Sequence, residues 1–147
     1  MVTPVTLWVR GQGGDHRARI VLGVRILATI VWIVFGGIFK VLGVVPRHQE
    51  IVANILGGEH ARVITVLIGL AETALGLWWL IGFLPRICAL FQTAAIISMN
   101  VLELHYARPL LLAPVAMIIS NVIFLALVWY AALYAGMRST DVSFKRT

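Results

Sequence analysis

The chain has 147 residues, of which 61% are hydrophobic and only 12% are Asp, Glu, Lys or Arg, and its mean hydropathy is +0.96. Soluble domains are about half apolar and about a quarter charged, and a core of this length cannot remove so much apolar surface from water. A water-soluble domain is therefore excluded. The net charge of +6 comes from basic residues scattered at the edges of apolar segments. Anionic lipid headgroups are therefore the expected partners, and nucleic acid is not.

A helix needs about 20 residues to cross the hydrocarbon core of a bilayer. Apolar segments predict four spans, at about 26–45, 63–84, 87–105 and 110–136. Short connections make consecutive helices antiparallel neighbours. We therefore expect an all-α integral membrane four-helix bundle with up-down topology over residues 20–136. A polar juxtamembrane tail (1–19) precedes it and a basic tail (137–147) follows it.

The basic residues are divided unequally between the two ends of the predicted bundle. One end holds eight: Arg10, Arg17, Arg19, Arg25, Arg86, Arg138, Lys145 and Arg146. The other holds three: Arg47, Arg62 and Arg108. The positive-inside rule then predicts that both termini are cytoplasmic. Trp78 and Trp79 lie toward the same inner end, as interfacial anchors would.

The connection Arg47–His60, between the first two spans, carries apolar residues at helical spacing. It predicts a short helix on the outer interface, ended by Gly57 and Gly58.

Two charged residues lie inside the predicted spans. Lys40 is near the outer end of the first, and Glu72 is near the middle of the second. A charge at the bilayer centre costs about 2.5–3.5 kcal/mol on insertion scales, so it needs a partner or a wet cavity. Lys40 shares a helix face with glycines at 36, 37 and 43, and Glu72 shares one with glycines at 69 and 76. Small residues at this spacing allow close helix packing, so we infer a Lys40–Glu72 contact inside the bundle.

Other interpretations of this pair stay open. Lys40 could extend its side chain outward to the interface. Glu72 could be protonated and only hydrogen-bonded. The pair could also be purely structural, since a buried ion pair is weak evidence even for stability.

Further polar residues lie at similar depth. Gln92 and Asn100 are on the third span, and Ser120 and Asn121 are near the middle of the fourth. With Lys40 and Glu72 on the first two spans, every span brings a polar group to the middle or outer half. We expect a buried polar site formed by Lys40, Glu72, Gln92, Asn100 and Asn121, in a cavity that opens outward. Interhelical hydrogen bonds alone would explain the amides equally well.

A second polar cluster is expected on the outer face, formed by His48, Glu59, His60, Glu103 and His105. Histidine and carboxylate together could bind a transition metal or relay protons. Their spacing matches no ligand motif, so we expect no metal site. The single cysteine, Cys88, excludes an intramolecular disulfide and is expected to be a small core residue.

The sequence resembles the DoxX-like family of small four-helix bacterial membrane proteins. The resemblance rests on Arg25 through Trp32 to Phe-Gly-Gly-Ile-Phe-Lys40, and on Ile68-Gly-Leu-Ala-Glu72-Thr-Ala-Leu-Gly76-Leu. The four-segment layout continues it to about Ala135. It implies a multi-pass protein of the bacterial cytoplasmic membrane. Relatives include a subunit of a thiosulfate:quinone oxidoreductase, and Glu72 and Lys40 carry over as the distinctive polar residues.

Three functions fit these observations. The first is an accessory subunit of a quinone-linked or other membrane redox complex, without catalytic activity of its own. The second is a self-sufficient small-molecule or quinone site, an enzyme or transporter, centred on Glu72 and Lys40. The third is a purely architectural membrane subunit. No intrinsic cofactor is expected, because the chain has no CxxCH haem motif, so a quinone or a partner's cofactor would carry electrons. The expected partners are lipids and a larger complex or further copies of the chain.

Overall fold

The computed structural model describes the backbone of residues 4–144 and the side chains of residues 16–134. Its elements are α1 (Pro4–Trp32), the π-helix η1 (Ile33–Val41), α2 (Arg47–Leu56), α3 (Ala61–Ile81), α4 (Pro85–Tyr106), the 3-10 helix η2 (Arg108–Leu110) and α5 (Pro114–Phe144). Within the described residues, four helical segments are long and apolar enough to cross a membrane: His16–Val41, Ala61–Ile81, Pro85–Tyr106 and Pro114–Tyr134. The predicted all-α, four-span membrane fold is confirmed.

The helix bounds differ from the predicted spans at several ends. The first helix begins well before residue 26 and ends at Val41 rather than at 45, and Gly43 then takes a positive φ of 73°. The last helix begins at Pro114 rather than at 110, because proline fits the first turn of a helix but not its interior. Hydropathy marks apolar residues, whereas backbone hydrogen bonds decide where a helix ends. The predicted tails, 1–19 and 137–147, lie largely outside the residues whose side chains are described.

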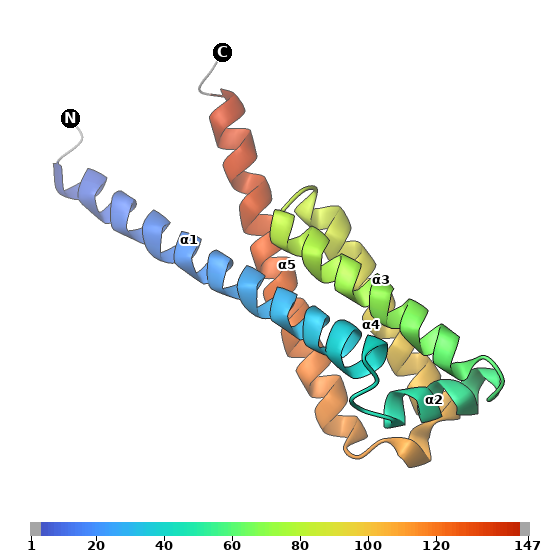
Figure 1. The fold of residues 1–147 in the computed structure, drawn as a ribbon. Helices are drawn as coiled ribbons and strands as arrows, with labels where there is room; N and C mark the ends of the chain where they lie inside the picture. Colours follow the sequence, from blue (N-terminus) through green and yellow to red (C-terminus); the bar gives the residue numbers. More distant parts are fainter. Residues whose placement is uncertain (1–3, 145–147) are drawn as a thin grey trace.

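The helices form a splayed bundle in which α1 and α5 cross, while α3 and α4 run side by side as an antiparallel pair (Figure 1). The first span packs mainly on α3 through η1, and α4 packs on α5. The short helix α2 lies at the end of the bundle where η1 stops, against α3 and α4. This confirms the predicted helix in the first connection, which ends at Gly57 with a φ of +92°.

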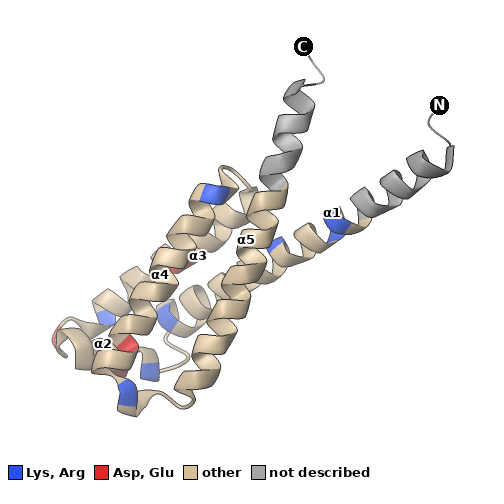
Figure 2. Ribbon diagram, turned by 180° about the vertical axis from the view of Figure 1, so that it is seen from behind, with Lys and Arg blue, Asp and Glu red and all other residues tan. Residues whose placement is uncertain are grey.

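The core at the opposite end of the bundle is apolar. Trp79 is 1% exposed and packs there with Cys88, Ala28 and Val128. The prediction that Trp79 anchors the interface is therefore wrong: its ring fills the space among the packed helices. Cys88 is a buried core residue, as expected. The charged positions of the described chain gather instead near α2, with few along the middle of the spans (Figure 2).

Candidate functional site

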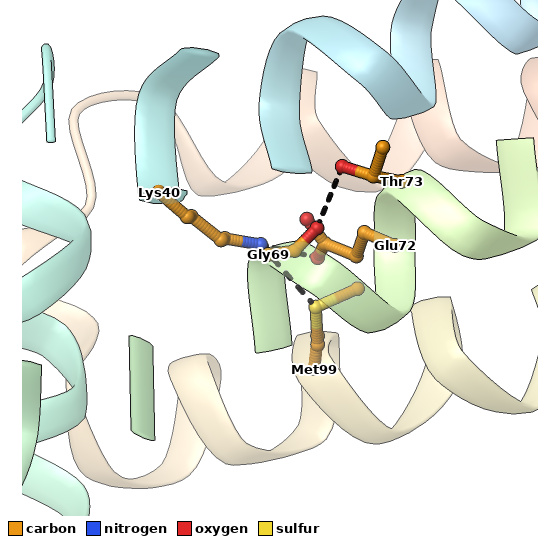
Figure 3. Close-up of polar contacts among 5 residues, drawn as sticks. All are labelled: Lys40, Gly69, Glu72, Thr73 and Met99. Atoms are coloured by element: carbon orange, nitrogen blue, oxygen red, sulfur yellow. Dashed lines mark hydrogen bonds and ion pairs between the residues drawn. The ribbon is translucent and has the colours of Figure 1, made fainter. Parts of the chain in front are cut away.

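An ion pair joins the first two spans inside the bundle. The Lys40 ammonium on η1 donates a hydrogen bond to Glu72 Oε1 on α3, and the two residues are 8% and 3% exposed. Figure 3 shows the Lys40 side chain extending toward Glu72, and Met99 Sδ on α4 lies 3.8 Å from the same nitrogen. Glu72 is about 16 Å from the start of α3 at Ala61, near the middle of the span. The contact inferred from the sequence is confirmed.

Glycines bring the two helices close enough for this contact. A Cβ atom at Gly36 would lie 2.6 Å from the Gly69 carbonyl oxygen and 2.8 Å from Glu72 Cβ. A Cβ atom at Gly69 would lie 2.5 Å from the Gly36 carbonyl oxygen and 2.8 Å from Lys40 Cβ. The backbones of η1 and α3 therefore touch at this crossing, which sets the Lys40 and Glu72 side chains beside each other.

A second-span residue holds the end of the first span. Arg62 on α3 donates hydrogen bonds to the carbonyl oxygens of Lys40, at 2.8 Å, and Val41, at 2.7 Å. The last carbonyls of a helix have no partner within the helix, so the guanidinium satisfies two of them. The backbone that carries Lys40 is thus fixed by α3 at two points, Gly69 and Arg62.

A cavity of about 600 Å³ lies beside the ion pair and is lined by all the spans and by α2. Lys40, Glu72, Asn100 and Asn121 line it together. Asn121 Nδ2 on α5 donates a hydrogen bond of 2.8 Å to Asn100 Oδ1 on α4, which joins the third and fourth spans. Four of the five residues expected in the buried polar site therefore meet at one cavity.

Gln92, the fifth residue, lies in a separate contact, which corrects the prediction. Its Oε1 accepts a hydrogen bond of 2.7 Å from Trp32 Nε1, and its Nε2 donates one of 3.4 Å to Cys88 Sγ. Gln92 contacts α1 rather than lining the cavity, and on α4 it lies about two turns nearer Pro85 than Asn100 does. It does orient Trp32, and the Trp32 ring lines the cavity.

The residues expected in the outer-face cluster do not form one group. His48 on α2 and Glu103 on α4 line the cavity. Glu59 and His60 are exposed in the connection between α2 and α3, and the exposed His105 ring packs on Tyr106 with centroids 4.5 Å apart. Neither Glu59, His60 nor His105 lines the cavity. Among the described residues, no group of three or more metal-ligating side chains forms.

His48 brings a titratable ring to the outer wall of the cavity. Its ring lies against the aromatic rings of Phe39 and Phe35, with centroids 5.9 and 6.5 Å away. Burial, with the nearby Lys40 charge as the next cause, lowers the pKa of His48 from 6.5. The neutral imidazole is therefore the favoured form near neutral pH.

Three side-chain atoms of residues that line the cavity lack a hydrogen-bond partner. Glu72 Oε2, Arg47 Nε and His48 Nδ1 are buried and make no hydrogen bond within the described chain. Buried polar atoms are ordinarily paired, so an unpaired carboxylate oxygen beside a cavity is suited to a bound hydrogen-bonding group. The cavity therefore offers both kinds of polar group, since Lys40 and Asn100 carry N–H donors and Glu72 carries an acceptor oxygen.

Sequence reasoning missed several parts of the site. Arg47 was counted only as a basic residue of the outer side, yet it lines the cavity. The apolar part of the cavity wall includes Trp32, Phe35 and Phe124. Apolar residues within a span are expected everywhere, so the sequence did not single these three out. The π-helix was also missed; the only local sign of irregularity is the Gly-Gly pair at 36 and 37.

Comparison with known proteins gives one match. A family model described as the DoxX-like family matches residues 29–129, which include the second and third spans in full, parts of the first and fourth, and all the residues of the cavity. No curated protein and no solved structure matches the chain.

Proposed function

This chain is a small multi-pass membrane protein of the DoxX-like family, and from this premise we propose that it binds a small molecule of quinone type in the cavity beside Lys40 and Glu72. The observation that carries the proposal is the cavity itself. Its volume of about 600 Å³ lies within the usual range of small-molecule sites, about 300–1,000 Å³. A purely architectural subunit would have a packed interior there, so the cavity favours a binding function.

The residues around the cavity have distinct roles in this proposal. Lys40 and Asn100 donate hydrogen bonds to the ligand, and Glu72 accepts one through Oε2. The Trp32 ring, held by Gln92, forms an apolar wall for a ring system. A bound quinone would supply reversible two-electron chemistry, and the Glu72 carboxylate would accept a proton from the hydroxyl of its reduced form.

We further propose that the protein acts as an accessory subunit of a membrane redox complex, in the bacterial cytoplasmic membrane that the family resemblance implies. The supporting observation is that the sequence has a single, buried cysteine and no haem-attachment motif of its own. Electrons would then reach the ligand from a partner protein.

Ligand binding is tested with a matched pair of variants. Glu72→Gln removes the charge and one acceptor oxygen from the cavity, whereas Glu59→Gln makes the same change at an exposed residue outside it. Binding of a decyl-substituted benzoquinone to protein in nanodiscs is followed by quenching of tryptophan fluorescence, since Trp32 lines the cavity. We expect Glu72→Gln to weaken binding about tenfold, the loss of one charge-assisted hydrogen bond, and Glu59→Gln to leave it unchanged. Equal affinities in both variants would contradict the proposed site.

The accessory role has a separate test. Solubilisation of native membranes in a mild detergent, followed by purification of the tagged chain, should co-isolate a larger protein with redox cofactors. Recovery of the chain alone or as a homo-oligomer, with quinone binding intact, would refute the accessory role and keep the binding site.

A further inference from the structure

The cavity has a mouth inside the depth of the membrane. Phe35 lines the cavity and is also 47% exposed. Its neighbour Gly36 crosses α3 at Gly69, about 12 Å from the start of α3 at Ala61. Since α3 is about as long as the hydrocarbon core is thick, Phe35 lies at the depth of the acyl chains.

The last span forms the opposite rim. Ser120 and Ala116, one turn apart on α5, are exposed and also line the cavity. Ser120 lies about 9 Å inside the first residue of α5, Pro114. The α1 part of the first span contacts α5. The η1 part of the same span packs instead on α3 and α2. A gap between η1 and the outer half of α5 is therefore open sideways to the bilayer.

Helix α2 covers part of the outer end of the cavity, while Leu112, which also lines it, is 87% exposed. Ile51 on α2 lines the cavity there and is 6% exposed. The Asn54 side-chain amide on the same helix donates a hydrogen bond to the Tyr106 carbonyl oxygen at the end of α4. Helix α2 is thus tied across the outer end of the bundle, over the polar part of the cavity.

The wall is polar at one end and apolar at the mouth. Lys40, Glu72, Asn100 and Asn121 lie inside, whereas Val31, Phe35, Met117 and Phe124 lead to the opening. The charged lining residues balance, since Lys40 and Arg47 stand against Glu72 and Glu103. Such a wall suits an uncharged hydrogen-bonding headgroup attached to an apolar chain.

We infer that the ligand is a lipid-soluble molecule that enters sideways from the acyl-chain region, between Phe35 on the first span and Ser120 on α5. Its uncharged head reaches Lys40 and Glu72, and its apolar tail stays in the mouth and in the bilayer. This inference rests on the proposed binding function and adds the class of ligand and its route.

The route is tested by narrowing the mouth. Ser120→Phe places a ring at the rim, whereas Ile119→Phe places one on the adjacent exposed position of α5 that does not line the cavity. Association of the decyl-substituted benzoquinone, preloaded into the bilayer of protein-containing vesicles, is followed by stopped-flow tryptophan quenching. We expect Ser120→Phe to slow association about tenfold, within the range over which related complexes differ in rate, and Ile119→Phe to match the wild type.

A second measurement uses the unmodified protein. The same benzoquinone with a diazirine near the end of its decyl chain is photolysed after binding, and the labelled peptides are sequenced by mass spectrometry. We expect labels on the segments 29–35 and 115–124. Labels on α2 together with wild-type association rates in Ser120→Phe would overturn the lateral route and leave the binding site standing. Absence of binding by the wild type would overturn the proposed function and the route together.

Discussion

Lys40 and Glu72 are each acceptable in the membrane interior only because the other is present. Removing one partner leaves a buried charge without compensation, whereas replacing both with apolar residues of similar size removes the problem. We therefore expect Lys40→Met and Glu72→Leu each to lower the free energy of unfolding by about 3–5 kcal/mol, and the double variant to cost much less than their sum. Unfolding by SDS in mixed micelles, followed by tryptophan fluorescence, gives these values. Additive losses in the double variant would show that the two residues do not interact.

We expect the free energy of unfolding to depend on pH through His48. Burial and the Lys40 charge lower the pKa of this ring from 6.5 in the folded chain, so the unfolded chain takes up the proton at higher pH. The free energy of unfolding should consequently fall as the pH drops below about 6.5. His48→Gln should remove this part of the decrease, and His60→Gln, at an exposed position, should retain it. Unfolding in mixed micelles between pH 7.5 and pH 5 compares the two; the same decrease in both variants would exclude His48 as its source.

The sequence predicted the contacts of some site residues but not of others. The Lys40–Glu72 contact followed from glycine spacing, because the small residues of each helix mark the face that packs. Gln92 has no such marker, and its polarity alone did not reveal that it pairs with Trp32. Arg47 and His48 line the cavity because α2 folds back over the bundle. The spacing of apolar residues along the sequence does not show how α2 packs on the other helices.

At the scale of elements, the crossing of η1 and α3 is the tightest contact around the site. Gly36→Ala would push a methyl group against the Gly69 carbonyl oxygen, whereas a Cβ atom at Gly23 on α1 meets nothing within 4 Å. We expect Gly36→Ala to lower the free energy of unfolding by about 1–3 kcal/mol and to weaken quinone binding. Gly23→Ala should be neutral or slightly stabilising, since alanine is the better helix former. The same mixed-micelle unfolding assay compares them, and a neutral Gly36→Ala would mean that the helices separate at no cost.

The number and order of the spans could be predicted, since each span needs only a long apolar segment. The π-helix η1 could not. Its hydrogen bonds, such as that from the Leu42 amide to the Gly37 carbonyl oxygen, are local in sequence. Helix α3 nevertheless holds the π-helix in place, because Gly69 packs against its backbone and Arg62 binds its last carbonyl oxygens. π-helical turns often lie at functional sites, and this one carries Phe35 and Lys40 to the cavity.

The whole molecule should cross the membrane with both termini in the cytoplasm, as the uneven count of basic residues predicts. The α2–α3 connection and the α3–α4 turn lie at opposite ends of α3 (Figure 1), so single cysteines can report on them. In a Cys88→Ala background, Glu59→Cys should react with a membrane-impermeant maleimide in intact cells, and Arg86→Cys only after lysis. Both positions are exposed. The reverse pattern of labelling would invert the assigned orientation.

Helix α3 supplies the ion-pair partner of Lys40, Glu72 Oε1, and two contacts that hold its backbone, the Gly69 crossing and the Arg62 guanidinium. All of them have been synthesised once the ribosome has passed Ile81. The first hairpin can therefore pair its charges before α4 and α5 pack against it. The later helices α4 and α5 then add the wall of the cavity that carries Asn100 and Asn121. The order of synthesis thus separates formation of the ion pair from formation of the cavity.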